Sequence, residues 1–247
     1  MSFGSSPIRS VVGIFASNTS LLAFAGTLLL TALAPSAGLA QDGPAQEVFL
    51  PKGEKGPVVV VISGQSGIPN YRNYATRVAG LGYYTVLIDG KDILTRAQVG
   101  AQNLRSVIAR GQASPNGTPG KVMVIGFSQG GGGVLAHAAV MPDLVAAAVV
   151  HYPAVSWARN IAGVASRIRI PILVLAAERD RYNNCCLIET IRELEAAAKA
   201  KQVPLELVVY PHADHGFNLD GRNYRAGDTA DAWRRATEML AKYHPVK

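Results

Sequence analysis

Two kinds of hydrophobic pattern alternate along the chain from about residue 51 onward. Val58–Ser63 is a continuous run rich in β-branched residues, which is typical of a strand buried on both faces. Ala97, Ala101, Leu104 and Ile108 instead recur at helical spacing and form one apolar stripe. Strands are predicted over residues 58–63, 84–88, 122–126, 145–150, 170–175 and 205–210. Helices are predicted over residues 74–81, 97–108, 130–140, 187–198 and 233–243.

Six buried strands separated by helices are typical of a parallel sheet with helices on both faces. A short segment near Glu47–Leu50 is a candidate for an additional edge strand. Residues 114–120 are rich in turn formers, and the poorly patterned stretch Pro153–Arg169 is too short for a separate cap domain. The expected fold is therefore one α/β domain over residues 41–247, with a mostly parallel central sheet and no large cap.

The first forty residues carry a different pattern. Arg9 precedes an apolar block over residues 21–34, which is too short to span a bilayer comfortably as a helix. Pro35 follows the block, and Gly38–Ala40 has the small-residue pattern of a signal-peptide cleavage site. Residues 1–40 are therefore predicted to be a signal peptide, which implies a periplasmic or secreted protein with no stable membrane insertion after cleavage. An uncleaved N-terminal anchor is the alternative.

Composition and charge exclude several classes of protein. Hydrophobic residues make up 49% of the chain and charged residues 17%, which excludes a disordered chain. Two cysteines in 247 residues exclude a disulfide-stabilised miniprotein. The formal net charge is +7, but no run of Lys and Arg concentrates it, so no nucleic-acid partner is expected.

The segment Gly126–Gly130 (GFSQG) matches the pattern G-x-S-x-G. A predicted strand enters it and a predicted helix leaves it, which is the context of a nucleophile elbow. Such a turn projects the Ser128 hydroxyl above the sheet edge, and glycines on either side avoid collisions with neighbouring elements. Ser128 is therefore the predicted nucleophile. The alternative is a glycine-rich turn that binds phosphate or only packs.

A serine hydroxyl needs a general base, and the base needs an acidic partner. His215 is the favoured base because it precedes Gly216 on a loop after the last predicted strand, and His212 is the alternative. Asp180 follows the predicted strand at 170–175, so it is expected at the same edge of the sheet as Ser128 and His215. Glu178 is the competing acid, whereas Asp214 is adjacent to His215 and badly placed to reach it.

An oxyanion hole needs two backbone N–H donors. Gln129, which follows the nucleophile, is expected to supply one of them. Gln65, in the loop after the first predicted core strand, is the candidate for the other.

Gly126–Gly130, Asp180 and the sequence His215–Phe217 (HGF) on a short scaffold resemble the dienelactone hydrolase family of the α/β-hydrolase superfamily, over roughly residues 45–245. The resemblance implies the α/β-hydrolase fold, a Ser/Cys–Asp–His triad, and ester or lactone hydrolysis without a cofactor. Members that cleave dienelactone carry a cysteine nucleophile. Ser128 stands at that position here, which favours a serine-nucleophile member that acts as a general carboxyl-ester hydrolase.

Three aromatic side chains, Tyr152, Trp157 and Tyr182, lie in predicted loops at the catalytic edge and are candidates for either pocket lining or core. Cys185 and Cys186 are adjacent, so they form either a vicinal disulfide or two packed thiols. Two thiols without a nearby histidine cluster lack the four ligands of a zinc site. No phosphate or dinucleotide motif is present, so neither a metal nor a cofactor is expected.

The sequence thus predicts an exported serine hydrolase that cleaves a small-molecule ester or lactone through an acyl-enzyme. One alternative is an acyl-peptide or prolyl-type serine peptidase, although nothing in the chain resembles a propeller or gating domain. The other is a non-catalytic binding protein on the same scaffold, which would not require Ser128, Asp180 and His215 together.

Overall fold

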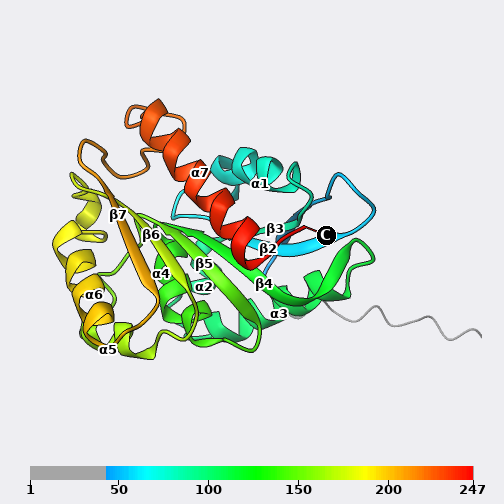
Figure 1. Cartoon of the computed structure of the whole chain (residues 1–247), viewed down its shortest axis with the longest axis horizontal. Helices are drawn as coiled ribbons and strands as arrows, with labels where there is room; N and C mark the ends of the chain where they lie inside the picture. Colours follow the sequence, from blue (N-terminus) through cyan, green and yellow to red (C-terminus); the bar gives the residue numbers. More distant parts are fainter. Residues whose placement is uncertain (1–42, 247) are drawn as a thin grey trace, which may run out of the picture. The chain divides into compact units, whose positions relative to one another are not determined.

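The computed structural model describes residues 43–246, and these residues build a seven-stranded sheet with the order β1-β3-β2-β4-β5-β6-β7 (Figure 1). Six strands are parallel, and β1 pairs with β3 in the antiparallel direction. The strands are β1 Gln46–Phe49, β2 Gly56–Ile62, β3 Tyr84–Ile88, β4 Gly117–Phe127, β5 Val145–His151, β6 Ile172–Ala177 and β7 Leu205–Tyr210. The expected mostly parallel sheet and the additional edge strand are both present.

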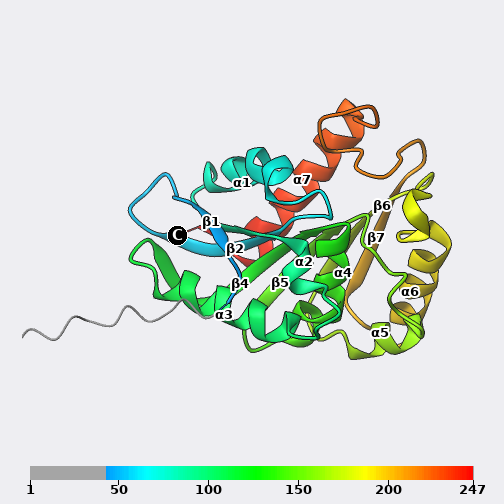
Figure 2. The same ribbon diagram turned by 180° about the vertical axis from the view of Figure 1, so that it is seen from behind.

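Helices cover both faces of the sheet (Figures 1 and 2). The α-helices are α1 Arg72–Ala79, α2 Gly90–Ile93, α3 Gly100–Ala113, α4 Gln129–Ala136, α5 Ile161–Arg167, α6 Ile188–Ala200 and α7 Ala226–Tyr243. Three short 3-10 helices are η1 Ile68–Tyr71, η2 Ala138–Val140 and η3 Tyr182–Asn184. Helices α1 and α7 pack on one face of the sheet, and α2 to α6 pack on the other.

Alternate residues of the buried strands face opposite cores, as strand geometry requires. In β2, Val58, Val60 and Ile62 belong to the core beneath α2 to α6, whereas Val59 and Val61 belong to the core beneath α1 and α7. All five are at most 1% exposed, which explains the continuous apolar run in the sequence.

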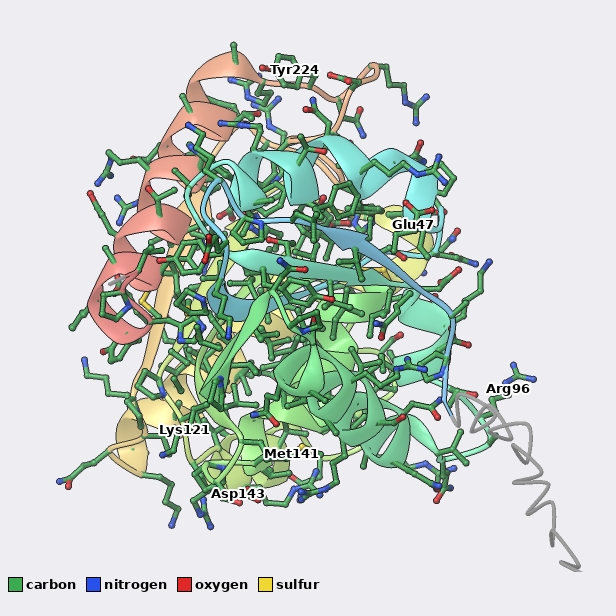
Figure 3. All side chains as sticks on the ribbon, turned by 90° about the vertical axis from the view of Figure 1, so that its right-hand side faces the viewer. Glu47, Arg96, Lys121, Met141, Asp143 and Tyr224 are labelled. Carbon is green, nitrogen blue, oxygen red and sulfur yellow. A yellow bond between two sulfur atoms is a disulfide. The ribbon has the colours of Figure 1, made fainter. Side chains whose placement is uncertain are left out.

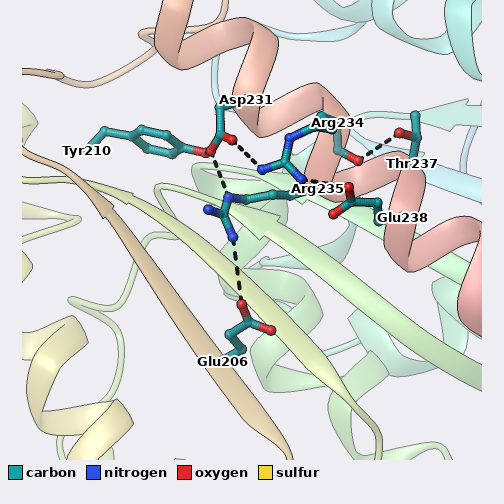
Figure 4. Close-up of polar contacts among 7 residues, drawn as sticks. All are labelled: Glu206, Tyr210, Asp231, Arg234, Arg235, Thr237 and Glu238. Carbon is teal, nitrogen blue, oxygen red and sulfur yellow. Dashed lines mark hydrogen bonds and ion pairs between the residues drawn. The ribbon is translucent and has the colours of Figure 1, made fainter.

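Polar contacts link the two edge strands, β1 and β7, to helices α1 and α7. Glu47 on β1, labelled in Figure 3, forms an ion pair with Arg72 at the start of α1, with 2.6 Å between oxygen and nitrogen. At the other end of the sheet, Asp231 of α7 accepts hydrogen bonds from the hydroxyl of Tyr210 at 3.0 Å and from Nε of Arg235 at 2.7 Å (Figure 4). The second cluster ties α7 to the end of β7, next to the loop that carries His215.

Several predicted boundaries differ from the observed ones. Strand β4 begins at Gly117, inside the segment predicted as a turn, because Gly117 and Thr118 pair with Gly56 and Pro57 before a register shift. The predicted helix over 130–140 is α4 followed by η2, and the break lies at His137. Helices α2 and α5 were not predicted, and α5 lies within the stretch expected to be irregular.

No helix among residues 43–246 is long and apolar enough to cross a bilayer. The predicted signal peptide, residues 1–40, lies outside the described residues.

Candidate active site

Ser128 lies on a strained turn between β4 and α4. Its φ of 48° is in the left-handed region, which is costly for a residue with a Cβ. Three backbone hydrogen bonds hold this conformation: the Ser128 N–H donates to the His151 carbonyl, and the Ser128 carbonyl accepts from the N–H groups of Gly132 and Ala154. A Cβ at Gly130 would collide with the carbonyl oxygen of Ser63, so the close approach of α4 to β2 requires glycine there.

His215 and Asp180 are hydrogen-bonded to each other. The Nδ1 atom of His215 lies 2.7 Å from Oδ2 of Asp180, which is fully buried. The other carboxylate oxygen, Oδ1, accepts a hydrogen bond of 3.0 Å from the Tyr182 N–H. A carboxylate in this position fixes the tautomer that leaves Nε2 free to accept a proton.

The competing residues have other partners. Nδ1 of His212 lies 3.2 Å from a guanidinium nitrogen of Arg179, and Glu178 forms an ion pair with Arg192. The Asp214 carboxylate accepts a hydrogen bond from the His215 backbone N–H and makes no bond to the ring. Of the residues considered, the structure therefore joins His215 with Asp180.

The two proposed oxyanion donors, the N–H groups of Gln65 and Gln129, come from two different elements. Gln65 follows β2 in a turn closed by a hydrogen bond from the Gly67 N–H to the Gly64 carbonyl. Gln129 begins α4, where the helix dipole favours negative charge. Within the described chain, neither the Gln65 N–H nor the Gln129 N–H donates a hydrogen bond to a protein acceptor.

Ser63 fixes the position of this turn. Its hydroxyl donates to the Gly64 carbonyl and accepts from the Gly90 N–H, while its carbonyl accepts from the Gly130 N–H. The loop after β2 is thereby attached to the starts of both α2 and α4, so that the Gln65 and Gln129 amides lie on elements held together by Ser63.

A pocket of about 160 Å³ contains Ser128 and His215. It is lined by Gln65, Ser66, Tyr71, Ser128, Tyr152, Tyr182, His215, Gly216 and Leu219. The Tyr182 ring stacks on the His215 imidazole with 4.5 Å between ring centroids, and the Tyr152 ring meets the imidazole in a T-shaped contact at 4.8 Å. Trp157 does not line this pocket, because its indole N–H donates to the Ala154 carbonyl and its ring packs against the core.

Behind Tyr152 lies a buried network that the sequence did not indicate. The Tyr152 hydroxyl donates to Asn218 Oδ1 at 2.8 Å, and Asn218 Nδ2 donates to His151 Nδ1 at 3.0 Å. Burial lowers the pKa of His151 to about 3, so this imidazole is neutral at neutral pH. A neutral ring that accepts at Nδ1 carries its proton on Nε2, and Nε2 has no partner within the described residues.

Tyr71, Asn218 and Leu219 are pocket or network residues that sequence reasoning missed. Tyr71 lies seven positions after the Gly64 turn and Asn218 directly follows the His-Gly-Phe segment, but neither position carries a recognisable motif. Their roles become visible only when the ends of separate strands are brought to one edge.

Cys185 and Cys186 are joined by a disulfide, which resolves the alternatives left open by the sequence. Together with His215 they form the single group of three potential metal ligands found in the part of the chain that the structure describes. Sulfur atoms in a disulfide are not thiolates, and His215 is engaged by Asp180, so this group does not fit the four-ligand site of a structural zinc ion.

Comparison with known proteins agrees with this architecture. Residues 45–244 match the profile of the dienelactone hydrolase family. A relative from Methylorubrum extorquens named "Putative carboxymethylenebutenolidase" is 25% identical over 233 residues, which cover 82% of this chain and 78% of the relative. One of the same name from Escherichia coli K12 is 32% identical over 136 residues, which cover 50% of this chain and 46% of that protein. Several of these matches therefore span only about half the length of the curated relative.

Solved structures share the fold. A crystal structure described as a putative dienelactone hydrolase from Klebsiella pneumoniae has a TM-score of 0.67 at 22% identity and covers 81% of this chain and all of that one. Esterase 2 of Thermogutta terrifontis with bound propionate has a TM-score of 0.62 at 18% identity and covers 84% of this chain and 97% of that one. The expected α/β-hydrolase fold is thus confirmed, and the chain belongs to the dienelactone hydrolase family.

Proposed function

We propose that this protein is a serine hydrolase of small carboxyl esters. The hydrogen bond between His215 Nδ1 and the buried Asp180 carboxylate, at a pocket that also contains Ser128, is the observation that carries the proposal. Membership of the dienelactone hydrolase family supports ester or lactone hydrolysis as the type of reaction.

In the first half of the proposed reaction, the Ser128 oxygen attacks the ester carbonyl carbon while His215 Nε2 accepts the hydroxyl proton. The carbonyl oxygen becomes an oxyanion held by the N–H groups of Gln65 and Gln129. The tetrahedral intermediate then collapses as the C–O bond to the alcohol breaks, and the leaving oxygen takes the proton from the imidazolium. In the second half, His215 removes a proton from water, and the water oxygen attacks the acyl carbon. The C–O bond to Ser128 then breaks, the Ser128 oxygen takes the proton back from the imidazolium, and the acid is released.

The pocket favours a neutral ester with a short acyl group. Its volume of about 160 Å³ is below the roughly 300–1,000 Å³ typical of sites for drug-sized ligands. Tyr152, Tyr182 and Leu219 supply an apolar wall, and the pocket lining includes no Lys or Arg to pair with a substrate carboxylate. We therefore infer that an uncharged short-chain ester fits better than an anionic lactone.

Labelling with a fluorophosphonate probe tests the nucleophile. Wild-type protein should be labelled and Ser128→Ala should not, whereas Ser156→Ala, which changes an exposed serine nearby, should be labelled like the wild type. Absence of labelling in folded wild-type protein would refute the proposed function.

A panel of p-nitrophenyl esters from acetate to laurate, with p-nitroanilides of matched acyl groups, tests the substrate class. We expect the highest kcat/KM between acetate and butyrate and little amide cleavage. Preference for laurate would contradict the short-acyl assignment, and preference for anilides would indicate a peptidase.

We also propose that the chain is exported after removal of residues 1–40. The apolar block at residues 21–34 and the small-residue segment Gly38–Ala40 support a signal peptide, and the Cys185–Cys186 disulfide is consistent with an oxidising compartment. Expression of the full chain in a bacterial host, with N-terminal sequencing of the periplasmic fraction, should give Gln41 as the first residue. Full-length protein retained in the cytoplasm would contradict export.

A further inference from the structure

Tyr71 brings a side-chain hydroxyl into the pocket of the nucleophile. It is the last residue of η1, which directly follows the loop that carries Gln65. Its ring is 2% exposed and packs on Phe127, the residue before Ser128, with 4.9 Å between ring centroids. The phenol thus has a rigid apolar body and a polar end that lines the same pocket as Ser128.

Gly64 shows how close this hydroxyl lies to the site of reaction. A Cβ at Gly64 would collide with the Tyr71 hydroxyl oxygen and would lie 3.2 Å from the Cβ of Ser128. The phenol oxygen of Tyr71 and the side chain of Ser128 therefore both lie next to Gly64, in the loop after β2. A side chain at position 64 would occupy the space beside the Tyr71 hydroxyl, which lies against the backbone of Gly64, the residue before Gln65.

The phenol of Tyr71 keeps its proton at neutral pH. Burial raises the pKa of Tyr71, and hydrogen bonds from the Ser66 side chain and the Gly64 backbone offset this only in part, so the group is a neutral O–H at neutral pH. A neutral phenol has a proton to donate, and the pocket is the space in which an acceptor can be placed.

We propose that the Tyr71 O–H is a third donor to the oxyanion that forms when Ser128 attacks the ester, beside the amides of Gln65 and Gln129. This assignment rests on the proposed function, since it concerns the same tetrahedral intermediate. A donor held rigidly where negative charge develops stabilises the transition state more than the ground state and so raises kcat. The proton stays on the phenol throughout, and no bond to Tyr71 forms or breaks.

Tyr71→Phe tests the assignment, because it removes only the hydroxyl and keeps the ring on Phe127. We expect kcat for p-nitrophenyl acetate to fall about 10- to 100-fold with KM changed less than about twofold, since one oxyanion donor is lost. The rate of labelling by a fluorophosphonate should fall with it, because the phosphonyl oxygen occupies the same position as the oxyanion.

Tyr74→Phe is the matched control. Tyr74 packs on the same Phe127 ring at 4.8 Å, but its buried hydroxyl has no partner within the described residues and does not line the pocket. Its loss should leave kcat unchanged. Equal thermal unfolding midpoints for wild type and Tyr71→Phe would show that the rate loss is not a folding defect.

The outcomes separate this inference from the proposed function. If wild-type protein is labelled at Ser128 and Tyr71→Phe keeps wild-type kcat, Tyr71 is not a donor and the serine hydrolase assignment stands. An equal loss of kcat in Tyr71→Phe and Tyr74→Phe would indicate a packing effect and would overturn the inference. Without labelling of the wild type at all, the proposed function itself fails.

Discussion

The Asp180 carboxylate, which is fully buried, lies 2.7 Å from the Nδ1 atom of His215, although the two residues are 35 positions apart in the sequence. Each follows a different parallel strand, β6 and β7, and these strands are neighbours in the sheet. The pair therefore exists because the carboxyl ends of adjacent parallel strands meet at one edge.

Replacing Asp180 by Asn should reduce kcat for p-nitrophenyl acetate by about 10³- to 10⁴-fold, because an amide favours the wrong imidazole tautomer and cannot stabilise the imidazolium. Glu178→Gln is the control, since Glu178 pairs with Arg192 at the surface. Steady-state kinetics of both variants check the assignment. A larger loss in the Glu178 variant would identify the other acid as the partner.

Replacing His215 by Ala should reduce kcat at least about 10³-fold, because the proposed nucleophile Ser128 then lacks its proposed base. His212→Ala should retain wild-type kcat, since His212 is exposed and contacts Arg179. The two variants should be compared with the same ester at pH 7. Inactivity of His212→Ala, with His215→Ala active, would reverse the assignment.

The disulfide should affect activity more than global stability. Its two cysteines are adjacent, so loop closure restricts the unfolded chain very little. Yet its sulfur atoms and a nitrogen of His215 lie within 4.8 Å of one another, and the Cys185 N–H donates to the carbonyl of Tyr182, whose ring stacks on His215. We expect the double variant Cys185→Ser/Cys186→Ser to lose kcat severalfold, while its unfolding midpoint shifts by less than about 4 °C.

Reduction of the wild type with dithiothreitol should reproduce that loss of kcat, and the double serine variant should not respond to the reductant. Unchanged activity in both experiments would show that the disulfide does not influence the position of His215.

His151 should make the protein less stable in mild acid. Its pKa is about 3 in the folded protein and 6.5 for the ordinary group, so between these values the unfolded state binds the extra proton. Above pH 6.5 this imidazole does not reduce the free energy of unfolding. As the pH falls below 6.5, the free energy of unfolding declines, by about 2 kcal/mol at pH 5. His151→Gln keeps an acceptor for Asn218 and should remove this part of the decline, whereas His212→Gln should not. Urea unfolding at pH 7 and pH 5 gives the comparison.

Asp231 also makes the stability fall with decreasing pH, but in a more acidic range, through the contacts in Figure 4. Burial alone would raise its pKa, but hydrogen bonds from Arg235, Arg234 and Tyr210 outweigh burial and lower the pKa to about 2. The stabilisation is therefore present above the ordinary value of 3.8 and is lost as the pH falls towards 2. Asp231→Asn should unfold at lower urea concentration than wild type at pH 7, and the two curves should converge near pH 2. Asp220→Asn, which changes an exposed carboxylate, should follow the wild type throughout.

Much of the fold follows from local pattern. Burial on both faces forces continuous apolar runs, so β2 to β6 were predictable. The edge strand β7 is mostly half-buried and was predicted with its observed boundaries. The start of β4 was not predicted, because Gly117 and Thr118 lie in the turn-rich segment 114–120 and form a strand only by pairing with β2. Helix α5 was missed because it is only seven residues long, although Ile161, Val164 and Ala165 recur at helical spacing and pack on the core.

Ser128, Asp180 and His215 could be chosen from the sequence because a short motif, strand ends and chain order each limit where such residues can lie. The sequence favoured Trp157 and Tyr182 equally as pocket residues. Of these two, the structure places only Tyr182 in the pocket, where its ring stacks on His215. Tyr71 carried no local signal at all. Sequence determines which side chains are available at each strand end, since that depends on neighbours along the chain. Only the tertiary structure decides which of them share a pocket, because distances across the sheet depend on strand order and packing that no single segment contains.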